Sequence, residues 1–115
     1  MKSMRSAMPE LVPLLPDRVR TRPDHFAWVD HRLREHLHRY TLEELALLFF
    51  LHLAADRNGC SFWSDTGLAR KLHLSEGVVV EARHGLIAKE AVAYRYPIYQ
   101  LLELPGGAQP QGARP

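Results

Sequence analysis

Apolar residues recur with helical spacing in the middle of the chain. Two short stripes lie between residues 62 and 90: Leu68, Ala69 and Leu72, then Val79, Ala82 and Leu86. Residues three and four apart share one face of an α-helix, so the pattern predicts two short helices. Ser64 or Asp65 can cap the first helix and Ser75 the second, because a side-chain oxygen accepts from an orphan backbone N–H. His73 and Leu74 are left to form the tight turn between them.

A longer helix is predicted from Thr41 to Asp56. Thr41 followed by Glu44 is a capping box, and the body of the segment is apolar almost all round, which is typical of a central, buried helix. Gly59 suits a left-handed turn after it. The expected core residues of the three helices are Leu45, Leu48, Phe49, Leu68, Leu72, Val79, Ala82 and Leu86.

Strand patterns and a further helical pattern flank these segments. Residues 91–96 and 98–104 alternate well enough for two strands, with Tyr96 and Pro97 as the turn of a hairpin. Residues 26–29 are expected to form a short strand. Asp30 can cap a helix running to Tyr40, whose basic face is either solvated or a contact for a DNA backbone or a second copy.

The apolar offsets, the turn and the second cap between Leu68 and Leu86 resemble the helix-turn-helix of bacterial winged-helix DNA-binding proteins. The resemblance covers about Thr41 to Leu104. It implies a mainly α fold with a small β-hairpin: a winged helix-turn-helix with a three-helix core, the hairpin as its wing, and an extra N-terminal helix. It also implies a short strand at residues 60–63. His73 and Glu90 stand where relatives often use glycine, which implies a left-handed conformation or a changed turn there.

Composition and the positions of proline and glycine divide the chain into three parts. A chain of 115 residues suits one domain, expected at residues 24–105. Residues 1–23 contain proline and arginine and are expected to form a disordered leader with no regular element. An alternative is a basic arm that gains phosphate contacts on binding. The polar tail at residues 106–115 is expected to be disordered.

The net charge and the cysteine content limit the binding partners and the cellular compartment that the sequence favours. A net charge of +2 permits a nucleic-acid partner only weakly. The one cysteine, Cys60, cannot form a disulfide within the chain, so a reducing, cytoplasmic location is expected. The longest apolar run is too short to cross a bilayer, and no membrane partner is expected.

The residue patterns predict no enzyme, no cofactor and no metal site. His31, His36 and His38 are separated by five and two residues, whereas ligands on one helical face need spacings of three or four. Cys60 lacks the second cysteine of a zinc pair. The chain also has no glycine-rich phosphate loop and no nucleophile elbow. No catalytic residue is therefore predicted.

The outward face of the second motif helix is the candidate binding surface. The resemblance implies that this face enters the major groove of DNA. The helical step turns outward Gly77, Glu81 and His84, with Val80 beside them. Glu81 can accept a hydrogen bond from a cytosine amino group, and Val80 can touch a thymine methyl group. Phosphate contacts are expected from surrounding cations: Arg70, Lys71, Arg83 and Arg95, with Lys89 nearby.

The charge balance leaves two functions open. Between residues 61 and 105, five basic side chains are matched by five acidic ones, whereas DNA-reading domains are more basic. The first function is a DNA-binding winged-helix protein, a transcriptional regulator or an accessory factor of a plasmid or mobile element. Its partner is double-stranded DNA, with a homodimer or a protein partner also open. The alternative is a protein–protein interaction module without autonomous DNA binding, whose contact face is Val78, Val80 and the aromatic wing.

Overall fold

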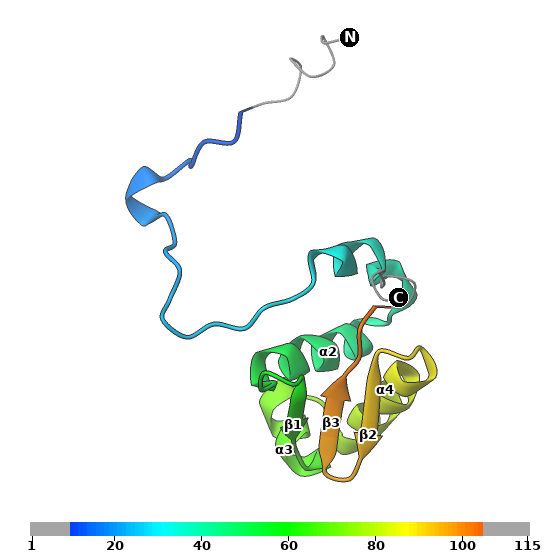
Figure 1. Cartoon of the computed structure of the whole chain (residues 1–115). Coiled ribbons are helices and arrows are strands. Elements are labelled where there is room, and N and C mark those ends of the chain that lie inside the picture. Colours follow the sequence, from blue (N-terminus) through cyan, green and yellow to red (C-terminus); the bar gives the residue numbers. More distant parts are fainter. Residues whose placement is uncertain (1–9, 105–115) are drawn as a thin grey trace, which may run out of the picture.

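The computed structural model describes residues 10–104. Residues 41–104 contain the three α-helices and the sheet and are called the folded part (Figure 1). Three helices and three strands follow one another as α2 (Leu42–Ala54), β1 (Cys60–Phe62), α3 (Asp65–Leu72), α4 (Glu76–Ala88), β2 (Val92–Arg95) and β3 (Ile98–Leu101). The strands form one antiparallel sheet in the order β1-β3-β2. This layout is mixed α and β, and it is consistent with a winged helix. The predicted hairpin is confirmed, and β1 extends it to three strands.

Local sequence signals set the boundaries of α2. Thr41 and Glu44 form the predicted capping box: the Thr41 hydroxyl accepts from the Glu44 N–H, and the Glu44 carboxylate accepts from the Thr41 N–H. Both bonds satisfy backbone donors that the first helical turn leaves without a partner. Gly59 has φ of +81°, so the left-handed turn predicted between α2 and β1 is also confirmed.

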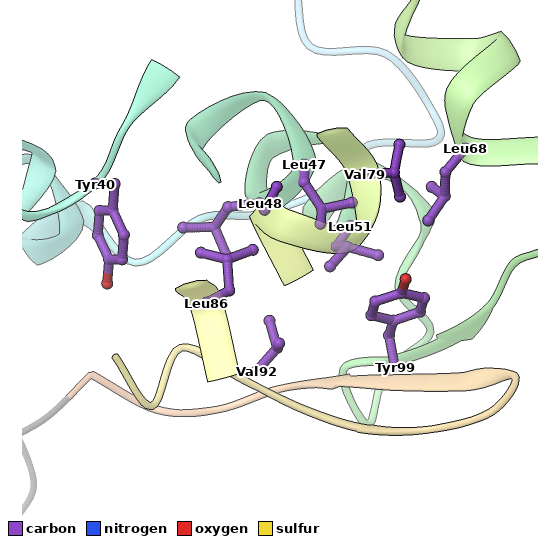
Figure 2. Packing of buried hydrophobic residues seen from close by; sticks show 10 residues of the cluster. Tyr40, Leu47, Leu48, Leu51, Leu68, Val79, Leu86, Val92 and Tyr99 are labelled. Carbon is purple, nitrogen blue, oxygen red and sulfur yellow. The ribbon is translucent and has the colours of Figure 1, made fainter. Parts of the chain in front are cut away.

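The core lies between the helices and the inner face of the sheet. Tyr99 and Val92 rise from the strands toward Leu47, Leu51 and the other buried side chains (Figure 2). Five predicted core residues are buried: Leu48, Leu68, Val79, Ala82 and Leu86. Two more, Leu45 and Leu72, are partly buried and pack against this cluster.

The prediction that Phe49 is buried is wrong, because its side chain is 61% exposed. The helical step of 100° places Phe49 on the side of α2 opposite the buried Leu47, Leu48 and Leu51. A helix that is apolar all round still has only one face against the core. The composition of α2 therefore could not identify its buried face.

The segment before α2 does not form the predicted strand or the predicted helix. Residues 26–29 have no regular structure, and two 3₁₀ turns follow, η2 (His31–Glu35) and η3 (Leu37–Arg39). Asp30 does cap η2, by accepting from the Arg32 N–H. Short helices need tertiary packing. Of the expected apolar stripe, Leu33 and Tyr40 pack on the core, whereas Val29 and Leu37 remain about half exposed. The stripe is therefore only partly covered.

The described part of the leader lies away from the core. Residues 10–23 are all exposed and contain one short turn, η1 (Pro16–Arg18). Figure 1 shows this segment extending away from the helices and the sheet. The expectations for residues 1–9 and for the tail at 106–115 concern positions outside the described residues.

Candidate nucleic-acid interface

Helices α3 and α4 are joined by a tightly bonded turn. Ser64, rather than Asp65, caps α3, and its hydroxyl accepts from the Gly67 N–H at 2.9 Å. Ser75 caps α4 by accepting from the Val78 N–H at 3.1 Å. Between them, His73 has φ of +59° and ψ of +43°, the left-handed conformation that the resemblance allowed. The two caps and the turn together fix the orientation of the first turn of α4 relative to α3.

The outward face of α4 is uncovered. Gly77, Glu81 and His84 are exposed, and Val80 is half-buried beside them. The opposite face buries Val79, Ala82 and Leu86 against the core. The first turns of α4 therefore present small and acidic groups to solvent, at positions that the domain itself does not use for packing.

Glu76 brings a second carboxylate to the start of α4. The Thr66 hydroxyl donates to this carboxylate at 2.8 Å, which ties α3 to α4. A negative charge is also favourable at a helix N-terminus, because the peptide dipoles point their positive end there. Glu76 thus has a structural reason to be acidic. That charge nevertheless opposes an approaching phosphate.

The expectation that Arg83 is an exposed cation beside the α4 face is wrong. The residue is 8% exposed, and its side chain reaches inward, where it forms a 2.6 Å ion pair with Asp65 of α3. It also donates to the Tyr99 hydroxyl at 3.0 Å and stacks 4.4 Å from the centre of the Tyr94 ring. Arg83 therefore connects α4 to α3 and to the sheet, and its guanidinium is not available to a phosphate.

The surroundings of Arg83 keep its guanidinium protonated. Burial lowers the pKa of Arg83, but the hydrogen bonds to Asp65 and Tyr99 outweigh burial, and the pKa is raised overall. Burial raises the pKa of the Tyr99 hydroxyl, against the opposing hydrogen bond from Arg83. A charged arginine and a neutral tyrosine are thus the stable forms of this buried cluster.

Lys89 was also expected near the cations around the α4 face, and its side chain too has a partner within the domain. Its ammonium pairs with the carboxylate of Glu44, a residue of α2 that is only 6% exposed. Glu44 therefore accepts from both the Thr41 backbone and Lys89. Its side chain lies so close to Gly85 that any Cβ there would overlap it. This contact joins the end of α4 to the start of α2.

The remaining predicted cations are exposed but lie on two separate elements. Arg70 and Lys71 are neighbours in the last turn of α3, where positive charge also suits the helix dipole. Arg95 ends β2 next to the hairpin turn. Arg95 pairs across the sheet with Ile98, and both side chains are exposed while their strand neighbours Tyr94 and Tyr99 face inward. Arg95 therefore leaves the sheet on the face away from the helices.

The positive charge of the chain lies mostly outside the folded part. Residues 41–104 contain six basic and eight acidic side chains, a net charge of −2, although the whole chain carries +2. Residues 1–40 contain eight basic and five acidic side chains, a net charge of +3. The described leader contributes the exposed Arg18, Arg20 and Arg22. A phosphate backbone near α4 would meet a folded surface whose overall charge is negative.

A separate hollow of about 520 Å³ lies at another end of the domain. The segment Phe26–Asp30 forms one wall, and the end of α2 and residues 101–104 form others. Its lining mixes aromatic rings with the carboxylates of Asp56, Glu90 and Glu103. None of the predicted DNA-contacting residues lines it.

Within residues 10–104, no group of three or more His, Cys, Asp or Glu side chains is arranged to hold a metal ion. His31 lies in η2, His36 between the two 3₁₀ turns, and His38 in η3. No helix in the same part of the chain is long and apolar enough to cross a membrane. No model of a protein family, no curated protein and no solved structure matches the chain, so its function must be inferred from its own residues.

Proposed function

We propose that the chain is a winged-helix protein that binds double-stranded DNA through the outward face of α4. A role as a transcriptional regulator, or as an accessory factor of a plasmid or mobile element, fits this activity. The observation that supports the proposal is an α4 braced on its inner face and at its capped start, with its first turns free of packing. A helix of this kind can enter the major groove.

The residues of this face divide into two roles. Gly77, Val80, Glu81 and His84 are the groups that would meet base edges, and Gly77 allows close approach of the backbone. Arg70, Lys71 and Arg95 would contact phosphates, which fixes the register without reading sequence. Because only these three predicted cations remain free in the folded part, we expect weak binding by a single copy.

The acidic groups should limit the affinity. Glu76 and Glu81 lie where a phosphate backbone would approach, and carboxylates close to phosphates oppose binding. Replacing Glu81 by glutamine should therefore strengthen binding to any duplex, while altering base preference only near its own contact. Glu103→Gln is a matched control, because Glu103 is an exposed carboxylate beyond the sheet, beside the separate hollow. The control should have little effect.

Fluorescence anisotropy with a labelled duplex of mixed sequence tests this proposal. The wild type should bind at low salt, and the Glu81→Gln variant should bind more tightly. Equal affinities of the Glu81→Gln and Glu103→Gln variants for the duplex would mean that α4 does not face the DNA. Absence of any association at low ionic strength and high protein concentration would contradict the proposal as a whole.

A second candidate is supported by the negative charge of the folded part. In that case α4 and the hairpin contact a protein rather than DNA, through Val78, Val80 and exposed aromatic groups such as Tyr96, which is 73% exposed. Interfaces of this kind rely on central apolar and aromatic anchors. The anisotropy experiment separates the two functions, because the protein-contact function predicts no salt-dependent binding to DNA.

A further inference from the structure

The outer face of α2 carries a second apolar stripe that the domain leaves uncovered. It lies directly opposite the buried Leu47, Leu48 and Leu51, and its members are Leu42, Ala46, Phe49 and Leu53. The exposed fractions of Leu42, Phe49 and Leu53 are 79%, 61% and 56%, and Ala46 is half-buried. A helix face toward water is ordinarily polar. This stripe contains no polar side chain, and we call it the outer stripe. An uncovered apolar face of this kind is a candidate surface for contact with another helix.

The spacing of the outer stripe is that of a helix–helix seam. Its members follow one another by four, three and four residues, the alternation found at the core positions of paired helices. The face is narrow, and Glu43 lies beside it. A partner helix fits this geometry better than a broad flat surface does.

The outer stripe is also complementary to itself in size. If two copies of α2 pack antiparallel about a two-fold axis between residues 47 and 48, Phe49 of each copy lies opposite Ala46 of the other. Leu42 then lies opposite Leu53, and both contacts occur twice by symmetry. A parallel pair would instead place Phe49 against Phe49 and Ala46 against Ala46. That arrangement packs poorly, since close packing needs large groups opposite small ones.

We propose that the outer face of α2 is a homodimer interface, in which two copies of this chain pack with their α2 helices antiparallel. This inference stands apart from DNA binding, because none of its residues belongs to the α4 face. The exposed segment around Leu11, Leu14 and Leu15 is a weaker candidate for covering the outer stripe. Pro13 and Pro16 interrupt that segment, so it cannot supply a continuous helical seam.

The area of the outer stripe indicates how strongly two copies should associate. Three large side chains per copy, each exposing roughly 100 Å², would together bury on the order of 600 Å², less than the roughly 1,200 Å² of stable interfaces. The flanking Leu45 and Phe50, both half-buried, can add some area. We therefore expect a reversible dimer that forms as the protein concentration rises, not a permanent one.

Sedimentation equilibrium of the full chain, from about 5 to about 500 µM, tests the dimer by mass action. The average mass of the wild type should rise from the monomer value of 13.2 kDa toward twice that value. Phe49→Glu places a charge at the centre of the interface, and should weaken dimerisation at least roughly 30-fold, as loss of a central anchor does. Phe62→Glu is the matched control, because Phe62 is 71% exposed on β1, and it should dimerise like the wild type.

Ala46→Glu gives an independent test of the pairing. Ala46 faces Phe49 of the second copy, so its replacement should weaken the dimer as strongly as Phe49→Glu, and it serves in place of that variant if the latter does not fold. Circular dichroism checks folding. A wild type that stays monomeric throughout would overturn the proposal, and this includes the case in which the segment around Leu11 covers the outer stripe. A dimer that survives both glutamates, or that Phe62→Glu weakens equally, would overturn it as well.

Discussion

Two partly buried ionic contacts determine what the charged residues of this domain can do. Arg83 with Asp65, and Lys89 with Glu44, each join elements that are distant in sequence. Arg83 and Glu44 are the buried partners, so removing Asp65 or Lys89 would leave a buried charge uncompensated, which is costly. These four charges are therefore committed to the fold. A charge count that treats them as surface groups overestimates the cations available to DNA.

The inward position of Arg83 could have been inferred from the sequence. Arg83 lies four residues after Val79 and three before Leu86, so it shares their helical face. Its charge favoured a surface interpretation, since an arginine is almost never fully buried unless it is paired. The identity of its partner could not be inferred, because Asp65 and Tyr99 reach it only through the packing of α3 and β3.

Gly85 provides a sharp test of the packing around Glu44. In Gly85→Ala, the new Cβ would overlap a Glu44 carboxylate oxygen, so the buried side chain must move and weaken its ion pair with Lys89. Overpacking a buried site costs about 1–3 kcal/mol, and alanine regains up to about 1 kcal/mol as the better helix former. The net loss of unfolding free energy should therefore be up to about 2–3 kcal/mol. Urea denaturation measures this loss.

Gly77→Ala is the matched control for Gly85→Ala. Its nearest neighbour would be the Ser75 hydroxyl at 4.0 Å, and alanine is the better helix former. It should be neutral or up to about 1 kcal/mol more stable than the wild type. A Gly85→Ala variant as stable as the Gly77→Ala variant would contradict the described position of Glu44.

Tyr99 predicts a loss of stability at alkaline pH. Because burial raises the pKa of Tyr99, the folded state keeps the hydroxyl proton at a pH where the unfolded chain loses it, near pH 10. The stabilising contribution is thus complete below that pH and declines as the pH rises above it. Unfolding free energies between pH 8 and 11 should fall less steeply in Tyr99→Phe than in the wild type.

At neutral pH, Tyr99→Phe should also lose roughly 1 kcal/mol, because the bond from Arg83 disappears. Identical alkaline slopes in Tyr99→Phe and the wild type would mean that Tyr99 does not carry this effect.

At the scale of elements, the boundaries with strong local chemistry were predictable. The capping box of α2, the Ser75 cap of α4 and the turn at Tyr96 and Pro97 each depend on residues close together in sequence. The segment from Asp30 to Tyr40 has helical periodicity, but periodicity stabilises a helix only when something covers the apolar face. Whether a covering surface exists depends on the whole fold. The sequence pattern therefore predicted a continuous helix where the structure has two 3₁₀ turns.

The turn between α3 and α4 stores strain that a substitution can release. His73 adopts the left-handed conformation, which is unfavourable for residues that have a Cβ. His73→Gly should stabilise the domain by about 1 kcal/mol, because glycine adopts this conformation without steric cost. Thermal denaturation followed by circular dichroism measures the change.

His84→Gly is the opposite control for the turn, because His84 is exposed in the interior of α4. It should destabilise the domain by roughly 0.5–1 kcal/mol, the cost of glycine within a helix. If both glycine variants were destabilised by the same amount, the described conformation of His73 would be wrong.

At the scale of the whole molecule, charge is divided between the leader and the folded part. The segment before Thr41 carries +3 and residues 41–104 carry −2. The exposed face of α4 followed from helical periodicity, and the sequence could identify its residues. The number of cations left free around it could not be predicted, because that number depends on which basic side chains find buried partners.

The salt dependence of duplex binding tests the central claim, that α4 binds DNA with only a few cations. With three phosphate contacts from Arg70, Lys71 and Arg95, the slope of log affinity against log salt should be about −2.7 per copy, a loss of roughly 40-fold between 50 and 200 mM salt. Replacing all three by alanine should weaken binding to every sequence and bring the slope close to zero. Arg57→Ala, at an exposed arginine beside the separate hollow, should retain the slope. A wild type with no salt-dependent binding, or a triple variant with an unchanged slope, would contradict the account.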